Sequence, residues 1–152
     1  MTIYLLCGIV GAGKSTWAKK KRDETEGCII VNRDDIRKML YGGRYVFSEV
    51  TEGVVRSIAM AAIDSAVESG LSVIIDETHI TRAKRAGVIE RLYGHRIVCV
   101  YFTETKDNLK NRMKSSRGVP EEKWKTVIDD MKAAFEKPDI AEGFAEIKEI
   151  SI

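Results

Sequence analysis

Short, nearly continuous apolar runs separated by segments of helical length limit the folds open to this chain. The runs lie at Ile3–Cys7, Cys28–Val31, Leu71–Ile75 and Ile97–Phe102, with a weaker one over Phe144–Ile152. Apolar residues occupy successive positions in the first four, which is typical of strands buried on both faces of a parallel sheet. The pattern therefore predicts an α/β fold with a five-stranded parallel sheet, flanking helices and right-handed crossovers.

Helices are expected in the segments between the runs. The clearest is predicted over Ser48–Ser69 and ends at Gly70, since glycine commonly follows the last helical residue. Its apolar stripe at three-to-four spacing is predicted to contain Val50, Val54, Ile58, Ala62 and Ala66. Further helices are predicted from near Lys14, over Thr81–Tyr93, over Thr105–Lys114 and over Pro120–Phe135, with Pro120 as the first helical residue.

Length and composition favour a single domain over residues 1–152. The chain is 44% hydrophobic and long enough to bury a core without a disulfide or a structural metal. It has no apolar stretch near ~18 residues and no secretory signal, so neither a membrane span nor export is expected. Cys7, Cys28 and Cys99 lie far apart in or beside apolar runs, which predicts buried thiols in a reducing cytoplasm.

The segment Gly8–Ser15 has the spacing of a phosphate-binding loop. Two glycines lie five positions apart and are followed by Lys14 and Ser15, between an expected strand and an expected helix. In such a loop the backbone N–H groups and the helix N-terminus converge on a polyphosphate. We therefore expect ATP to be held by Gly11, Ala12, Gly13, Lys14, Ser15 and Thr16, with Lys14 on the β and γ phosphates and Ser15 on Mg²⁺.

The rest of the chain narrows the class of nucleotide-binding protein. A GTPase would need a guanine-reading Asn-Lys-x-Asp motif, which the sequence lacks. A motor or AAA-type ATPase usually needs a carboxylate after the third strand, which Asp76 and Glu77 supply, but it also needs a larger body, so size argues against it. A compact kinase fits better, because it needs only the nucleotide loop, an acceptor site, a base and a cationic lid.

A charged cluster, Asn32–Arg37, follows the second expected strand. The carboxyl ends of parallel strands face the ligand crevice, so the cluster is expected beside the γ phosphate. A carboxylate there could accept a proton from a hydroxyl, and an arginine could hold an acceptor phosphate. Capping of the next helix by Asp34 or Asp35 is an equally good interpretation.

Both motifs together resemble a known family. The segments 11–18 and Asn32–Arg37 are similar to those of 5′-hydroxyl polynucleotide kinases, as in the kinase domain of bacteriophage polynucleotide kinase-phosphatase. The resemblance implies an adenylate-kinase-like P-loop fold. It also implies that Asp34 is the general base on a 5′-hydroxyl and that Arg37 contacts the phosphate on the 3′ side of the acceptor nucleotide.

The same resemblance assigns later residues. After the third strand the family has Asp, one residue, Thr and Asn, where this chain has residues 76–79 with His79 in place of Asn. Asp76 or Glu77 is expected to orient Mg²⁺-bound water or the acceptor, and Thr78 to bond near the acceptor. A short lid over about 112–120 is expected to bring Arg117 to the β and γ phosphates and Arg112 to the adenine or the phosphates.

The expected substrate is thus a 5′-hydroxyl end of DNA or RNA, with a ligase or phosphatase acting beside this kinase. The rivals are a small-molecule or nucleotide kinase of the same fold and a regulatory nucleotide-binding module. The net charge of +2 conceals an asymmetry, because Arg82–Arg117 contains ten Lys or Arg and three Asp or Glu. That basic segment favours a polyanionic acceptor. The sequence leaves DNA against RNA, the donor base and the oligomeric state open.

Overall fold

The computed structural model describes residues 1–103, 107–115 and 117–151, and its centre is one parallel sheet in the order β2-β3-β1-β4-β5. All four neighbouring pairs of strands are parallel. The predicted α/β fold with a five-stranded parallel sheet is confirmed. The strands are β1 (Ile3–Cys7), β2 (Cys28–Val31), β3 (Ser72–Ile75), β4 (Ile97–Phe102) and β5 (Glu146–Ile150).

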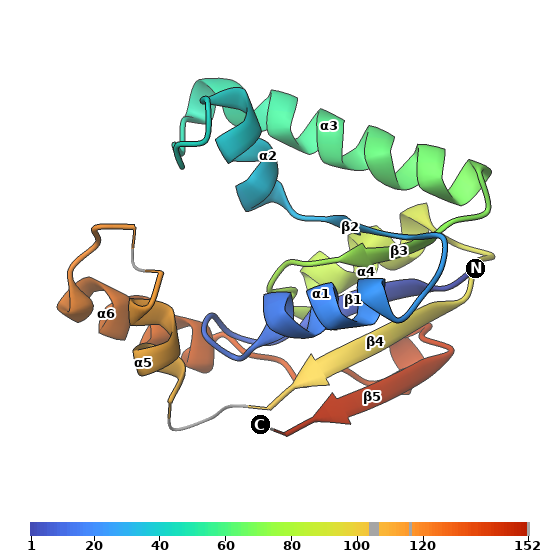
Figure 1. Ribbon diagram of the computed structural model, residues 1–152. Helices are drawn as coiled ribbons and strands as arrows, with labels where there is room; N and C mark the ends of the chain where they lie inside the picture. The colour runs from blue at the N-terminus through green and yellow to red at the C-terminus, as the bar shows by residue number, and fades with distance from the viewer. Residues whose placement is uncertain (104–106, 116, 152) are drawn as a thin grey trace.

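Helices connect these strands and cover the sheet (Figure 1). The predicted segments are helical within a few residues, except that Thr105 lies outside the described residues and Pro120 precedes the helix as its N-cap. The helices are α1 (Lys14–Asp23), α2 (Arg33–Leu40), α3 (Glu49–Glu68), α4 (Arg82–Arg91), α5 (Asn108–Met113) and α6 (Glu121–Ala133), followed by the 3₁₀ turn η1 (Ile140–Glu142).

The continuous apolar runs are explained by burial of both sheet faces. In β1, Ile3 and Leu5 pack in the cluster that includes the apolar side of α3, whereas Leu6 packs in the cluster that includes Ala18 of α1. Successive side chains of a strand point to opposite faces, so each face needs its own set of apolar residues. The strand residues are therefore apolar at every position rather than at every second one.

The predicted stripe on α3 is wrong over the first half of that helix. Val50 is 90% exposed and Val54 is 50% exposed, whereas Val55 is fully buried. The buried residues of α3 are Val55, Ala59, Ile63 and Ala66. A 20-residue helix is about 30 Å long, whereas a four-residue strand spans about 13 Å, so the first turns of α3 extend beyond β3. Helix α3 therefore has two stripes of apolar residues, and the stripe that begins at Val55 is the one that packs against the sheet.

A buried ion pair joins α4 to the last part of the chain. The Arg85 side chain is fully buried, and its Nε and Nη2 atoms donate to the two carboxylate oxygens of Glu142 at 2.7 and 2.8 Å. Its Nη1 atom donates to the carbonyl oxygens of His79 and Glu136. The charge of Arg85 is thus compensated, which a buried guanidinium requires.

Two further expectations from the sequence concern the cysteine thiols and membrane-spanning segments. Cys7 and Cys99 are fully buried, and Cys28 is half-buried, so two of the three expected thiols lie in the core. Among the described residues, every helix is too short or too polar to cross a bilayer.

The carboxyl ends of the strands lie along one edge of the sheet. The loop between β1 and α1, the start of α2 and the pair α5 and α6 all gather near this edge (Figure 1). This is the edge at which open parallel sheets bind ligands. The motifs identified in the sequence are therefore brought to one end of the molecule.

Candidate active site

The loop before α1 has the backbone shape of a phosphate cradle. Gly11 and Gly13 adopt positive φ values of 75° and 83°, and Gly13 is the N-cap of α1 without a side-chain cap. The loop's N–H groups are therefore not taken by a capping side chain. Lys14 is 8% exposed, and its Nζ atom donates to the carbonyl oxygen of Ile9 at 2.7 Å. Burial lowers the pKa of Lys14 to about 8, while the nearby Asp76 carboxylate partly opposes that shift.

Helix α5 supports this loop from the side. The Asn108 side-chain amide donates to the carbonyl oxygen of Val10 at 2.9 Å, and that of Asn111 donates to Gly11 at 3.2 Å. A Cβ atom at Gly11 would overlap the backbone carbonyl group of Asn108. The sequence analysis missed both asparagines, because nothing in a short polar helix indicates that it packs on a loop about a hundred residues away.

Asn32 decides between the two interpretations of the charged cluster. Its Oδ1 atom accepts the backbone N–H groups of Asp34 and Asp35 at 2.8 and 3.3 Å, so Asn32 is the cap of α2. Its Nδ2 atom donates to Asp76 at 2.9 Å, which ties the ends of β2 and β3 together. The carboxylates of Asp34 and Asp35 are therefore not needed as caps. Asp35 pairs with Lys38 near the surface, and Asp34 turns toward the P-loop side.

Two arginines hold the Asp34 carboxylate. Arg37 donates from Nη1 to Oδ1 at 2.7 Å, and Arg117 pairs with Oδ2. Arg37 is 8% exposed, and its Nε and Nη2 atoms donate to both oxygens of Glu52, each at 2.7 Å. These hydrogen bonds raise the pKa of Arg37 above its ordinary value and lower that of Glu52. The acceptor contact expected of Arg37 stays a prediction, since its donors lie on carboxylates here.

Aromatic rings position the two arginines expected in the lid. The Arg117 guanidinium lies 3.7 Å from the ring centre of Tyr45, and the Arg112 guanidinium lies 3.9 Å from that of Trp124. Burial lowers the pKa of Arg112, and its Nε atom is buried with no hydrogen-bond partner among the described residues. Ser116, inside the predicted lid, lies outside the described residues. Sequence analysis missed Tyr45, which belongs to the connection between α2 and α3.

Two adjoining cavities bring most of the predicted site residues together. The first, of about 690 Å³, lies over the P-loop, and the second, of about 790 Å³, lies beside α2. Ser15, Asp34, Asp76 and Arg112 line both. The first is also lined by residues 11–14, Thr16 and Thr78, and the second by Arg117; of the predicted set, Arg37 alone lines neither, because it lies behind Asp34.

The oxygen atoms in these cavities suit Mg²⁺. Ser15 supplies a hydroxyl and Asp76 a carboxylate, and protein-bound Mg²⁺ usually takes one or two carboxylates together with substrate phosphates. The described residues contain no group of three His, Cys, Asp or Glu that could hold a metal alone. The metal would therefore be bound jointly with a nucleotide.

The loop after β3 contains the buried His79. His79 is 5% exposed, its backbone φ is 40°, and its Nδ1 atom lies 3.0 Å from the carbonyl oxygen of Leu6. Burial lowers the pKa of His79, so a neutral ring donates this hydrogen bond. The hydrogen bond of His79 is thus structural, while Glu77 pairs with Arg33 and Thr78 lines the first cavity.

Solved structures of similar fold are kinases and RNA-repair proteins. A chain of the Pnkp1/Rnl/Hen1 RNA repair complex is 24% identical, with a TM-score of 0.71 over 89% of this chain and 46% of that one. A gluconokinase from Sinorhizobium meliloti 1021 is 16% identical, with a TM-score of 0.60 over 99% of this chain and 82% of that one. A fungal RNA kinase is 10% identical, with a TM-score of 0.66 over 98% and 38%. This chain thus spans less than half of the RNA-repair chain, and these likenesses establish a P-loop kinase-like fold.

A family model matches residues 3–138, and its description is "AAA domain". The sequence analysis set aside a motor or AAA-type ATPase on size and favoured a compact kinase; the family has the AAA name, and the solved structures of similar fold include kinases. The match includes the P-loop, the charged cluster of α2 and the arginines at 112 and 117. The chain belongs to the AAA_33 family of AAA domains.

Proposed function

We propose that this protein is an ATP-dependent kinase that transfers the γ-phosphoryl group to the 5′-hydroxyl of a polynucleotide. The observation that carries the proposal is the placement of Asp34. Its carboxylate is fixed by Arg37 and Arg117 on the wall of a cavity that Lys14 and Ser15 also line. A fixed carboxylate beside a P-loop is what proton removal from an acceptor hydroxyl requires.

In the proposed reaction the acceptor oxygen attacks the γ phosphorus of ATP. A bond forms between that oxygen and phosphorus, the bond from phosphorus to the β–γ bridging oxygen breaks, and ADP leaves. The hydroxyl proton passes to a carboxylate oxygen of Asp34. Lys14 stabilises charge on the β and γ phosphates, and Arg117 moves from Asp34 toward the transferring group.

Ser15 and Asp76 would hold Mg²⁺ together with the nucleotide, and the ion would neutralise phosphate charge during the transfer. The remaining catalytic effect comes from positioning. Asn108 and Asn111 fix the loop that receives the phosphates, and Glu52 fixes Arg37, which fixes the base. Thr78 lies where a hydroxyl could bond to the acceptor.

The polynucleotide acceptor is favoured by charge and by likeness. Two similar structures are described as an RNA repair complex and an RNA kinase. Several basic residues of the Arg82–Arg117 segment line the cavities, including Arg112 and Arg117. In this function the protein would act beside a ligase or a phosphatase, in a reducing compartment such as the cytoplasm, where Cys7 and Cys99 stay as thiols.

A small-molecule kinase is the second candidate. It is favoured by the coverage of the gluconokinase, 82% of which is matched by nearly the whole of this chain. A sugar acid would need only the acceptor pocket around Asp34. The two candidates differ in the acceptor and share the donor site.

The test is transfer of labelled γ phosphate to a 5′-hydroxyl oligonucleotide, to nucleosides, to nucleotides and to gluconate, by the wild type, Asp34→Asn and Asp35→Asn. Asp34→Asn keeps the side-chain shape but cannot take the proton, so we expect a loss of about 10²- to 10⁴-fold in kcat. Asp35→Asn is the matched control, because its side chain is 69% exposed and pairs with Lys38. Both variants should bind ATP like the wild type.

Transfer to gluconate with none to the oligonucleotide would replace the proposed acceptor by a small molecule. Normal turnover by Asp34→Asn would remove Asp34 as the base. An equal loss in Asp34→Asn and Asp35→Asn would mean that the charge of the α2 N-terminus matters and the position of one carboxylate does not.

A further inference from the structure

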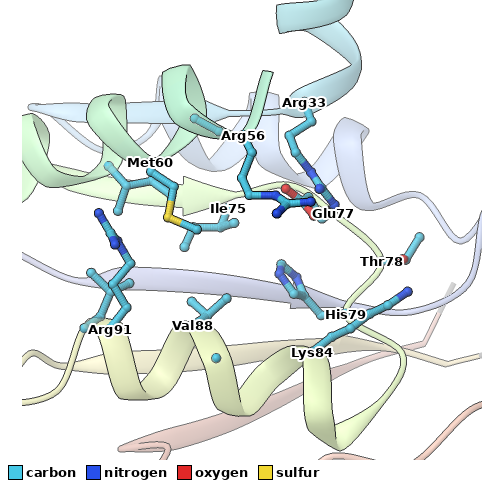
Figure 2. Close-up of a pocket in the computed structure, with 14 residues that line it drawn as sticks. Arg33, Arg56, Met60, Ile75, Glu77, Thr78, His79, Lys84, Val88 and Arg91 are labelled. Atoms are coloured by element: carbon cyan, nitrogen blue, oxygen red, sulfur yellow. Dashed lines mark hydrogen bonds and ion pairs between the residues drawn. The ribbon is translucent and has the colours of Figure 1, made fainter. Parts of the chain in front are cut away.

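A third cavity lies between α3 and α4 and is not explained by ATP binding. It has a volume of about 360 Å³, within the range of sites for small ligands, and Figure 2 shows it between the two helices and the end of β3. Glu77 and Thr78 line it and also line the cavity over the P-loop. The loop after β3 is therefore a shared wall between the nucleotide site and this third cavity.

The lining combines apolar walls with a basic rim. Apolar side chains come from α3, β3 and α4: Ala59, Met60, Ile63, Ile75, Val88 and Leu92. The rim carries Arg33, Arg56, Lys84 and Arg91 against one carboxylate, Glu77. With a neutral His79, the formal charge of the lining is +3. A cavity of this kind suits a ligand with a flat apolar part and a negative part.

Two of the four cations have no partner within the described part of the chain. Arg33 pairs with Glu77, and Arg91 pairs with Asp64. Neither the Arg56 guanidinium nor the Lys84 ammonium makes an ion pair or a side-chain hydrogen bond with another described residue. Figure 2 shows Arg56 extending toward Glu77 and Lys84 extending below Thr78. Both charges thus lie at the end of the cavity that adjoins the active site.

From these observations we infer that the third cavity binds the acceptor strand beyond its reacting nucleotide. The apolar walls take the next nucleoside, and Arg56 and Lys84 pair with the phosphodiester that follows it, which a nucleoside 3′-monophosphate lacks. The inference rests on the proposed function and deepens it, because a strand whose 5′ end lies at Asp34 can continue past Thr78 into this cavity. A sugar or sugar acid has no second unit to place there, so the cavity selects a polynucleotide.

The experiment measures binding and turnover separately. Binding of a short single-stranded 5′-hydroxyl oligoribonucleotide with a fluorophore at its 3′ end is followed by anisotropy over a series of salt concentrations. Turnover is followed with that oligonucleotide and with a nucleoside 3′-monophosphate, which reaches only the first acceptor position. The variants are the double substitution Arg56→Gln with Lys84→Gln and a control, Arg22→Gln with Lys148→Gln, which removes the same charge elsewhere on the surface.

We expect the Arg56 and Lys84 variant to bind the oligonucleotide at least tenfold more weakly. Its slope of log affinity against log salt should fall by about 0.7, because the contact with one phosphate of a single strand is lost. Its kcat/KM for the nucleoside 3′-monophosphate and its KM for ATP should equal those of the wild type. The control variant should match the wild type in every measurement.

Unchanged affinity and salt slope, or an equal change in the control, would overturn the assignment of this cavity. So would an equal loss of kcat/KM for both acceptors, since the cavity would then act on the first nucleotide. Failure of the wild type to phosphorylate any oligonucleotide would instead refute the proposed function. The binding measurement requires no turnover and therefore judges the cavity independently.

Discussion

The affinity for ATP should fall steeply as the pH rises above 8. Lys14 must be protonated to neutralise the β and γ phosphates, and burial lowers its pKa to about 8. A bound polyphosphate favours the charged ammonium and returns its pKa toward or above the ordinary value. Binding is therefore coupled to proton uptake, and the affinity is lost as the pH rises through the pKa of the free protein.

The size of the effect follows from the protonated fraction of Lys14. With a pKa of about 8, roughly nine tenths of the free protein is protonated at pH 7 and roughly one tenth at pH 9. The dissociation constant for ATP should thus be about tenfold higher at pH 9, which is about 1.4 kcal/mol. Above neutral pH the phosphates of ATP are already ionised, so their titration adds little.

Isothermal titration calorimetry with Mg²⁺ and a non-hydrolysable ATP analogue at several pH values would measure this change. The matched control is Lys14→Arg, because a guanidinium stays charged throughout the range. Its affinity is expected to be lower at pH 7 but constant to pH 9. Equal wild-type affinities at pH 7 and pH 9.5 would refute the argument that burial sets the charge of Lys14.

Three further substitutions test the packing that positions the site. Val55→Ala should lower the free energy of unfolding by about 2 kcal/mol in urea denaturation, whereas Val54→Ala, one residue earlier and half exposed, should change it by less than about 0.5; equal effects would contradict the buried stripe of α3. Gly11→Ala should abolish ATP binding in calorimetry while the far-UV circular dichroism stays native, because the added Cβ displaces α5 and Gly11 has a positive φ; normal binding would show that the loop does not need this contact. Arg85→Met leaves the buried Glu142 carboxylate with only Arg82, at 3.9 Å, as an ion-pair partner among the described residues, so it should lower the melting temperature through a loss of up to about 3–5 kcal/mol, and an unchanged melting temperature would show that the Arg85 ion pair is dispensable.

Much of the candidate site follows from local sequence, because phosphate binding by a P-loop depends on consecutive residues. The glycine spacing, Lys14 and Ser15 require only a strand before them and a helix after them. The role of Asp34 was less determined, since capping and catalysis fit the cluster equally well. The structure removes the capping alternative, because Asn32 caps α2, and this depends on side-chain direction rather than on spacing.

The supporting residues could not be predicted, because their partners are remote in sequence. Asn108 contacts the P-loop about a hundred positions away, and Arg117 reaches Asp34 across 83 positions. Glu52 holds Arg37 only because α3 returns along α2. Such contacts arise when whole helices and strands pack together, so a local pattern of polar residues does not predict them.

The sequence by itself determined the α/β class, the strands and the phosphate loop, because continuous apolar runs and closely spaced glycines act within single elements. Tertiary structure decided which stripe of α3 is buried, that Asn32 and neither aspartate caps α2, and where the basic residues of 82–117 lie. Arg85 is buried against Glu142, Arg112 and Arg117 line the cavity beside α2, and Lys84 lines the cavity between α3 and α4. A count of charged residues cannot predict these different positions, since each depends on the distances and the burial that the fold imposes.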